Sequence, residues 1–370
     1  MARVSLAILL AVLMLPQAVA ESRVPPPDFE TGYERPVLTF QTRQIFAREI
    51  ADAVVLMAAL GLSASFLLRK RSRASVFVLG LSCLLYLGVY KKGCICPVGA
   101  IQNVTCALCR ADYAVPIVVI AVFILPLIAA LMWGRVFCGS VCPLGAIQDL
   151  FLFRPIRVPR WLEASLGLLR YFFLGLAVFF VADRSVFIIC QYDPFVGFFR
   201  FAGPAWKYAL GAGLLGLGMF IGRPYCRFLC PYGAILSLLA RWTTSGVSIT
   251  PDECIRCKLC DDACPFGAIL RPAVEQRTST RSKILLASLA LLTLIALAIG
   301  GYFAGGKSVA GAILGLWFGL VIALKLISLM HRRERKAYEV DHAACLSCGR
   351  CYQWCPRERK RLAAAEARNG

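Results

Sequence analysis

Two cysteine runs near its C-terminal end constrain this 370-residue chain more than any other feature. They read Cys254-x-x-Cys257-x-x-Cys260-x-x-x-Cys264-Pro265 and Cys345-x-x-Cys348-x-x-Cys351-x-x-x-Cys355-Pro356. This spacing is typical of chains that bind two [4Fe–4S] clusters, in which the fourth cysteine of each run binds the cluster of the other run. Zinc ribbons and disulfide scaffolds are the alternatives, but zinc sites usually pair two C-x-x-C knuckles without the closing proline. The two runs are therefore expected to fold against each other.

The exchange of the fourth cysteine predicts two ligand sets. The first cluster is predicted to bind Cys254, Cys257, Cys260 and Cys355. The second cluster is predicted to bind Cys345, Cys348, Cys351 and Cys264. Basic residues lie beside these cysteines, namely Arg256, Lys258, Arg350 and Arg357. Their positive charge is expected to stabilise the reduced clusters and to raise their reduction potentials.

The composition indicates a membrane protein, because 59% of the residues are hydrophobic, only 17% are charged and the mean hydropathy is +0.70. Seven apolar runs are long enough, or nearly so, to span a bilayer. They are Ala51–Leu68, Ala74–Tyr90, Ala114–Trp133, Leu166–Ala182, Ala205–Ile221, Ile284–Phe303 and Ser308–Met330. We therefore predict an all-α polytopic membrane protein with about seven transmembrane helices and a cytoplasmic two-cluster module.

The N-terminal residues 1–20 have a positive residue, a short apolar core and Ala18-Val19-Ala20 before Glu21. This pattern predicts a cleavable signal peptide, with an uncleaved anchor as the alternative. Residues 21–50 then form an extracytoplasmic segment. The remaining predicted domains are a five-span membrane domain, a first iron–sulfur half, a two-span hairpin, and a second iron–sulfur half with a basic tail. Their ranges are 51–245, 246–275, 276–330 and 331–370.

The basic residues that give the chain its formal charge of +20 are distributed as this topology predicts. The four segments predicted to be cytoplasmic hold 27 of the 41 Lys and Arg residues, as the positive-inside rule requires. An even number of predicted spans separates the two cysteine runs, so both lie on the cytoplasmic face. We predict a multi-pass protein of the bacterial inner membrane with an extracytoplasmic N-terminus, a cytoplasmic C-terminus and no nucleic-acid partner.

A repeated sequence motif contains further cysteines. Its copies are Cys94-Ile-Cys96-Pro97-Val-Gly99-Ala-Ile-Gln102, Cys138-Gly-Ser-Val-Cys142-Pro143-Leu-Gly145-Ala-Ile-Gln148 and Cys226-Arg-Phe-Leu-Cys230-Pro231-Tyr-Gly233-Ala-Ile235. The topology brings together Cys138, Cys142, Cys226 and Cys230 at the cytoplasmic face. These four thiols are predicted to bind a further iron–sulfur cluster or another metal such as copper, or to form reversible disulfides.

The first copy falls on the extracytoplasmic side and is followed by another cysteine pair. A second possible four-thiolate site there would consist of Cys94, Cys96, Cys106 and Cys109. Disulfides are a serious alternative in that oxidising compartment. Cys190 lies on the same side and is expected to pair with one of these cysteines or to stay free.

Several other chemistries have no support in the sequence. The chain has two histidines, His331 and His342, and no C-x-x-C-H, which excludes c-type haem attachment and leaves no intramembrane histidine pair for b-type haem. It also lacks a G-x-G-x-x-G after a strand, a P-loop and an H-E-x-x-H. The redox groups that the sequence predicts are therefore ones held by cysteine sulfur.

The segment Gly-Arg-Pro-Tyr-Cys226-Arg-Phe-Leu-Cys230-Pro-Tyr-Gly-Ala-Ile, followed by Cys254–Pro265, resembles the polytopic ferredoxins of the NapH type. It is also similar to the iron–sulfur half of NosR, and the resemblance covers roughly residues 74–356. It implies a helical membrane bundle with cytoplasmic clusters that exchanges electrons with an extracytoplasmic reductase. NosR-like proteins carry a large flavin domain, whereas here only residues 21–50 occupy that place, so no covalent FMN is expected.

We therefore predict an electron-transfer subunit, rather than a stand-alone enzyme. It would link the quinone pool or a cytoplasmic reductant to an extracytoplasmic redox partner. The alternative is an assembly or regulatory factor that reduces copper or disulfides while a respiratory metalloenzyme matures. A purely structural scaffold would leave the two cysteine runs without a purpose.

Overall fold

The computed structural model describes residues 44–369, apart from 94–95, 111–112, 114, 201–202, 250–253, 274–279, 329–334 and 336. The chain divides into two units, residues 1–45 and residues 46–370, and nearly all of the described residues belong to the second. The predicted signal peptide, most of the predicted extracytoplasmic segment and Cys94 lie outside the described residues.

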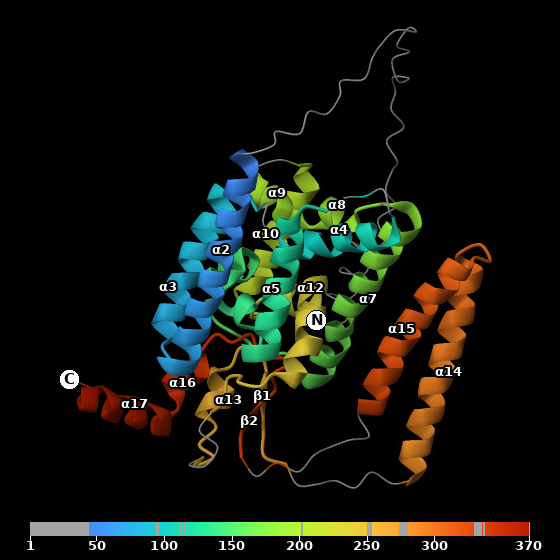
Figure 1. Ribbon diagram of the computed structural model, residues 1–370. Coiled ribbons are helices and arrows are strands. Elements are labelled where there is room, and N and C mark those ends of the chain that lie inside the picture. Colours follow the sequence, from blue (N-terminus) through green and yellow to red (C-terminus); the bar gives the residue numbers. More distant parts are fainter. Residues whose placement is uncertain are drawn as a thin grey trace. The chain divides into compact units, whose positions relative to one another are not determined.

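Helices dominate the described residues, as predicted (Figure 1). The longer helices are α2 (Gln44–Ala64), α3 (Arg73–Cys83), α4 (Pro97–Cys109), α5 (Ile117–Trp133), α6 (Pro143–Leu150), α7 (Arg160–Arg184), α10 (Ala205–Gly218), α12 (Pro231–Leu239), α14 (Thr280–Ala304), α15 (Val309–Ser328) and α17 (Pro356–Asn369). The short helices are α8 (Ile188–Tyr192), α9 (Pro194–Arg200), α11 (Pro224–Phe228), α13 (Leu259–Ala263) and α16 (Arg350–Trp354). Three segments are π-helical, with wider turns than an α-helix: η1 (Ser65–Arg69), η2 (Leu84–Tyr90) and η3 (Phe137–Val141). One segment, η4 (Ala240–Trp242), is a 3₁₀-helix.

Five helical segments are long and apolar enough to cross a membrane. They are Ile50–Arg69, Arg73–Tyr90, Trp161–Asp183, Thr280–Ala304 and Val309–Ser328, which correspond to five of the seven predicted spans. The other two predicted spans correspond to the shorter helices α5 and α10, of 17 and 14 residues. At 1.5 Å per residue, these cover about 26 Å and about 21 Å, less than the bilayer core of about 30 Å. Both helices lead into cysteine-bearing turns inside the bundle.

Helices α14 and α15 form a hairpin whose contact depends on glycine. Gly311, Gly315 and Gly319 recur every fourth residue of α15 and face α14. A Cβ on Gly315 would collide with the backbone carbonyl oxygen of Leu297. Small residues at this spacing let two apolar helices approach closely, where packing between backbones holds them together. Trp317 attaches α15 to α7, because its indole N–H donates to the Tyr171 carbonyl at 2.9 Å.

Gly315→Ala should therefore destabilise the hairpin by about 1–3 kcal/mol, because backbone must move to admit the methyl group. Thermal unfolding of the purified protein in detergent measures this loss. The matched control is Gly300→Ala in α14, where an added Cβ meets no atom within 4 Å. Equal unfolding temperatures for the two variants would contradict the close packing.

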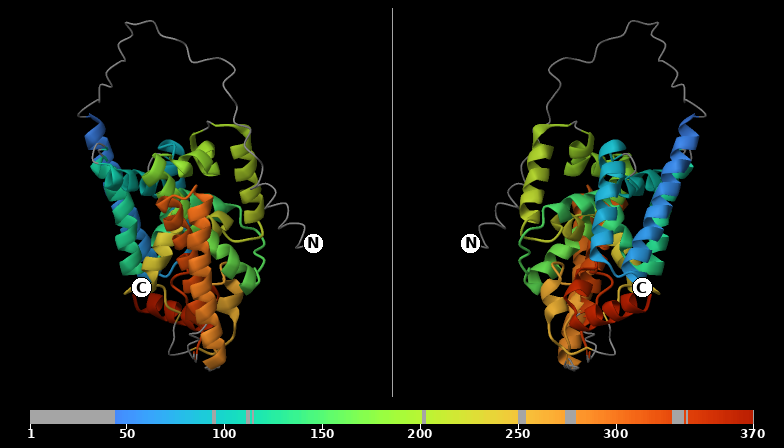
Figure 2. Two further views of the ribbon diagram at one scale, coloured as in Figure 1. Left: turned by 90° about the vertical axis from the view of Figure 1, so that its right-hand side faces the viewer. Right: turned by 90° about the vertical axis from the view of Figure 1, so that its left-hand side faces the viewer.

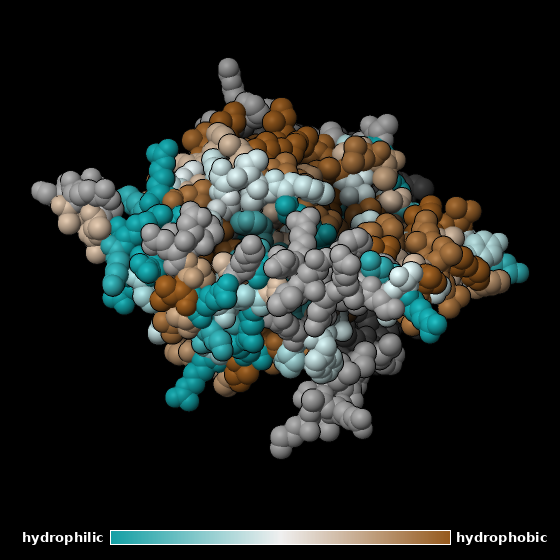
Figure 3. Space-filling model, turned by 90° about the horizontal axis from the view of Figure 1, so that it is seen from below, coloured by the Kyte–Doolittle hydropathy of each residue, from teal (hydrophilic) through white to brown (hydrophobic). Residues whose placement is uncertain are grey.

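The two cysteine runs fold into one small module at one end of the helical bundle, opposite the end that carries α4, α8 and α9 (Figures 1 and 2). Strands β1 (Ile269–Leu270) and β2 (Glu339–Val340) pair antiparallel, with Ile269 opposite Val340. Helices α13 and α16 pack against each other. Seen from the module's end, hydrophilic side chains gather in the middle and on the left, while hydrophobic ones predominate along the upper edge and on the right (Figure 3).

Candidate metal centres

The two cysteine runs share one backbone conformation. The second residue after the first cysteine has a positive φ in both runs, namely Arg256 (54°) and Ser347 (52°). The residue after the second cysteine also has a positive φ, 65° at Lys258 and 72° at Gly349. These left-handed residues turn successive backbone N–H groups toward one side, which makes a concavity suited to an anionic cluster. Non-glycine residues seldom adopt this conformation, so its repetition marks two equivalent binding loops.

Each predicted ligand quartet lines one cavity. One cavity has in its wall Cys254, Cys257, Cys260 and Cys355. The other has in its wall Cys264, Cys345, Cys348 and Cys351. The structure thus brings together the cysteines that the exchange between the runs requires.

The cavity walls suit a cluster. The backbone N–H of Ser347 donates to the Cys345 Sγ at 3.4 Å. Burial raises the pKa of the Cys345 thiol to about 12 and that of Cys260 to about 11, so these thiols ionise readily only beside compensating positive charge. Within the described ranges, no three Cys, His, Asp or Glu side chains converge as ligands of one ion. A cubane binds each thiolate through a different iron, so its ligands stand farther apart.

A third cysteine quartet lies inside the helical bundle, and we call it the core quartet. It consists of Cys138, Cys142, Cys226 and Cys230. Cys138 lies in η3 and Cys226 in α11, while Cys142 and Cys230 are extended residues directly before the prolines that begin α6 and α12. A proline at the first helical position needs no N–H partner, and it fixes where each helix begins. The second and third copies of the repeat lie against each other, since Gln148 of the second donates to the Cys226 Sγ of the third.

Hydrogen bonds point at the sulfur atoms of the core quartet. The Gln148 amide donates to the Cys226 Sγ at 3.2 Å, and the Gly233 N–H donates to the Cys230 Sγ at 3.3 Å. Burial raises the pKa of the Cys226 thiol to about 11. Burial also raises the pKa of Cys142 well above its usual value, and the charges of the other three thiolates raise it further. Thiols whose pKa is raised this far stay protonated unless a cation binds them, so a metal or cluster bound here would displace their protons.

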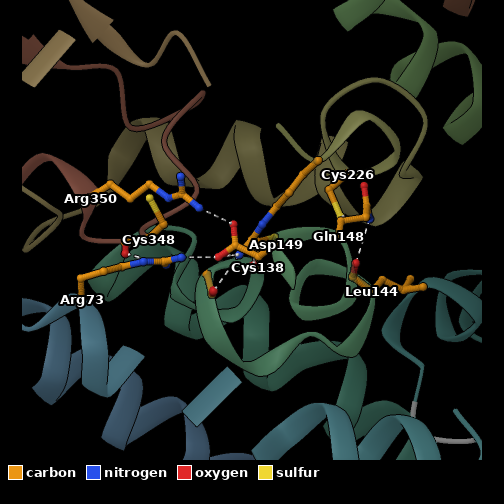
Figure 4. Close-up of polar contacts among 10 residues, drawn as sticks. Arg73, Cys138, Leu144, Gln148, Asp149, Cys226, Cys348 and Arg350 are labelled. Carbon is orange, nitrogen blue, oxygen red and sulfur yellow. Dashed lines mark hydrogen bonds and ion pairs between the residues drawn. The ribbon is translucent and has the colours of Figure 1, made fainter. Parts of the chain in front are cut away.

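Asp149, in α6, lies between the core quartet and the cluster module (Figure 4). Its carboxylate accepts from Arg73 at 2.5 Å and lies 3.4 Å from both Arg223 and Arg350. Burial alone would raise the pKa of Asp149, but the three guanidinium groups outweigh it and lower that pKa to about 2. Arg73 also donates to the Cys348 carbonyl at 3.0 Å. One ionised carboxylate thus joins the repeat to the second binding loop.

The core quartet and the module also touch directly. A Cβ on Gly139, next to Cys138, would lie 2.5 Å from the Ser347 carbonyl oxygen, so the second binding loop packs on the backbone of η3. Two more arginines bind module carbonyls: Arg135 donates to Ala343 at 3.2 Å, and Arg227 donates to Phe266 at 3.1 Å. The second cavity is therefore held beside the core quartet.

Asp149→Asn should cost about 3 kcal/mol of stability, because it leaves three arginines, including the fully buried Arg223, without a counter-charge. Thermal unfolding in detergent is the measurement. Asp262→Asn is the matched control, since Asp262 is 60% exposed and its surface ion pair with Arg157 contributes about 0–1 kcal/mol. Equal losses in the two variants would contradict a special role for Asp149.

Gly139→Ala should loosen the second binding loop, because the new methyl group displaces the backbone of Ser347. Hydrogen exchange of the amides of residues 345–349 should become faster. Gly167→Ala in α7, where an added Cβ meets no atom within 4 Å, should leave that exchange unchanged. Unchanged exchange in Gly139→Ala would mean that the loop does not rest on η3.

Of the cysteines predicted for the extracytoplasmic site, the structure describes Cys96, Cys106 and Cys109, and it does not bring these three together. Cys96 precedes α4 and Cys109 ends it, so they lie about 20 Å apart along a 13-residue helix. Cys106 is buried and Cys109 is exposed. The thiol of Cys190 instead lies at the first copy of the repeat, 3.9 Å from the position of a Cβ on Gly99.

Sequence reasoning did not find the polar residues that serve these sites. Arg135 and Arg223 precede the second and third copies at equivalent positions, and both are buried. The recurrence of an arginine three residues before the first cysteine of both copies was the sequence signal that could have identified them. Asp149 gave none, because only the fold brings its three arginine partners together from distant segments.

Two families, both described as "4Fe-4S binding domain", match the chain. One matches residues 115–160 and 203–249, and the cysteines in these ranges are those of the core quartet. The other matches residues 247–270, which contain the whole first cysteine run.

Curated relatives match parts of the chain. Protein NirI of Paracoccus denitrificans is 36% identical over 122 residues, which are 31% of this chain and 18% of that protein. Putative electron transport protein YccM of Escherichia coli is 28% identical over 131 residues, 33% of this chain and 36% of that protein. The chain thus spans well under two thirds of the length of these relatives. No solved structure matches it.

The fold and these sites define a helical membrane protein with 4Fe–4S binding domains. The matches to NirI and YccM confirm the predicted resemblance to membrane iron–sulfur proteins of the NapH and NosR type, and they support a role in electron transfer.

Proposed function

We propose that this protein carries electrons along three [4Fe–4S] clusters, from a donor at the exposed end of the module into the membrane bundle. Such clusters, when bound, accept and release single electrons. The observation that carries the proposal is the contact between the second module cavity and the core quartet, where the backbone of Ser347 packs on Gly139 beside Cys138.

The first cluster would bind Cys254, Cys257, Cys260 and Cys355, and the second would bind Cys264, Cys345, Cys348 and Cys351. The cavities and the paired left-handed turns support both assignments. The third would bind the core quartet. This assignment is supported by the 4Fe–4S family match over both of its cysteine pairs and by the N–H groups directed at its sulfur atoms.

The first cavity is suited to receive electrons from a soluble protein. Cys257 is exposed there, and Ile255 and Trp354 nearby are 53% and 58% exposed. The exposed basic residues Arg256 and Lys258 flank this apolar area. An apolar centre with a basic rim fits a donor with an acidic surface. A quinol at the membrane is the other donor that the membrane bundle permits.

The module would lie on the cytoplasmic face, and the acceptor would be an extracytoplasmic redox partner. The positive-inside distribution supports this orientation. The proposed domains are the membrane region 51–245, the module halves 246–275 and 331–370, and the hairpin region 276–330 between them, after a signal peptide and the short segment 21–50.

A factor that delivers copper or exchanges disulfides would need thiols that a partner can reach. Three of the four core thiols are at most 7% exposed. This burial favours a resident cofactor over a passing cargo.

Electron transfer across proteoliposomes tests the proposal. Titanium(III) citrate outside is the reductant, and ferricyanide trapped inside is the acceptor. Wild type should reduce the trapped ferricyanide, whereas Cys351→Ala and Cys226→Ala should fall to the rate of protein-free vesicles. Cys83→Ala, which changes a buried mid-helix cysteine outside the three quartets, should keep the wild-type rate. Full activity in Cys226→Ala would overturn the route through the core.

A further inference from the structure

We propose that Cys96, Cys190 and Asp193 hold a further iron–sulfur cluster, with two thiolate ligands and one carboxylate ligand, at the far end of the bundle from the module. The inference rests on the proposed function in one respect: it extends the same route toward the acceptor. We call these three residues the distal site.

The membrane bundle consists of two similar halves. In the first, the Cys-Pro turn at Cys96 leads through α5 to the Cys-Pro turn at Cys142. In the second, the Asp-Pro turn at Asp193 leads through α10 to the Cys-Pro turn at Cys230. One family matches both α5 with its following turn and α10 with its following turn, which independently indicates the duplication. The two halves meet at the core quartet at one end, and the duplication places their other two turns together at the opposite end.

The turns at the distal site repeat the local geometry of the core quartet. An extended residue stands directly before a proline that begins a helix in all four turns. Its φ and ψ are −117° and 107° at Cys96, −69° and 119° at Cys142, −67° and 115° at Asp193, and −65° and 113° at Cys230. Asp193 therefore occupies the place of the metal-binding cysteine in its half. A five-residue helical turn precedes three of these residues: η3, α8 and α11.

Gln102 repeats the role of Gln148. The Gln148 Oε1 accepts from the backbone N–H of Tyr225, and its Nε2 donates to the thiol of the next residue, Cys226. The Gln102 Oε1 accepts from the N–H of Ile189 at 3.1 Å, directly before Cys190. Gln102 is fully buried, yet its Nε2 has no partner among the described residues. A buried unpaired donor beside a cysteine is costly unless a ligand satisfies it.

The segments that carry the proposed ligands are neighbours. The Cys190 Sγ lies 3.9 Å from the position of a Cβ on Gly99, in the first turn of α4, which begins directly after Cys96. Asp193 is 2% exposed and accepts from the Tyr225 hydroxyl at 2.8 Å. Tyr225 is the residue before Cys226, so one buried side chain connects the distal site with the core quartet. Cys190 is exposed, which leaves the site open to a partner at its outer edge.

The chemistry of the donors fits iron. Thiolates select iron–sulfur clusters, and iron also accepts carboxylate oxygen. Among the described residues these side chains do not converge on a single ion, so the proposed ligands would have to bind different irons of one cluster.

Iron and sulfide analysis with EPR on anaerobically purified full-length variants tests the distal site. Cys190→Ala should lose the iron of one cluster and keep the module signals. Asp193→Cys, which exchanges one ligand for another, should keep the iron but shift the g values of one centre. Tyr225→Phe removes the hydrogen bond to Asp193 but no ligand, so the iron should stay. Cys109→Ala, at the far end of α4, is the matched cysteine control.

Wild-type iron in Cys190→Ala together with wild-type spectra in Asp193→Cys would overturn the distal site. Cys226→Ala separates this failure from that of the proposed function. If Cys226→Ala loses a cluster while Cys190→Ala does not, the core cluster stands and only the distal site is wrong. If Cys226→Ala also keeps its iron, the cluster at the core quartet fails as well.

Discussion

The carboxylate of Asp149 is the interaction on which the arrangement of the sites depends. It lies among Arg73, Arg223 and Arg350, which come from a membrane helix, from the third copy of the repeat and from the module. The low pKa that these arginines impose keeps it ionised at any physiological pH. Because a buried charge is tolerated only when paired, the assembly of each of these segments stabilises the others. The interaction therefore couples the folding of the module to that of the bundle.

Close backbone contact then sets the distance between the second module cavity and the core quartet. Gly139 admits the second binding loop against η3, and arginines on the repeat bind carbonyls of the module on either side of it. The bundle is built from two halves that place a proline-bounded turn at each end. Each half alone supplies only two cysteines at the core, so the quartet exists only where the halves meet. This explains why short helices, α5 and α10, lead to the sites: they stop within the bundle and deliver the cysteines there.

The sequence was most informative where ligands are close along the chain. The spacing of Cys254, Cys257 and Cys260 fixes a local loop, and the exchange with Cys355 follows from a rule about such loops. Grouping Cys96 with Cys109 failed because an α-helix of 13 residues separates them. Each of the predicted spans 114–133 and 205–221 was three residues longer than its helix, because the first begins before Pro116, where α5 is capped, and the second follows hydrophobic residues past Gly218, where α10 ends. The equivalence that we propose between Asp193 and a cysteine has no signal in the sequence, since it rests on backbone angles.

Iron and acid-labile sulfide analysis, with low-temperature EPR of the anaerobically purified, dithionite-reduced protein, tests the central claim most directly. The two module clusters account for about eight irons. We expect at least about twelve irons per chain, with magnetic coupling that extends beyond one pair of cubanes. About eight irons and a single coupled pair would leave the core quartet without a cluster and contradict the proposed route. Iron-free protein that carries zinc would contradict the electron-transfer function itself.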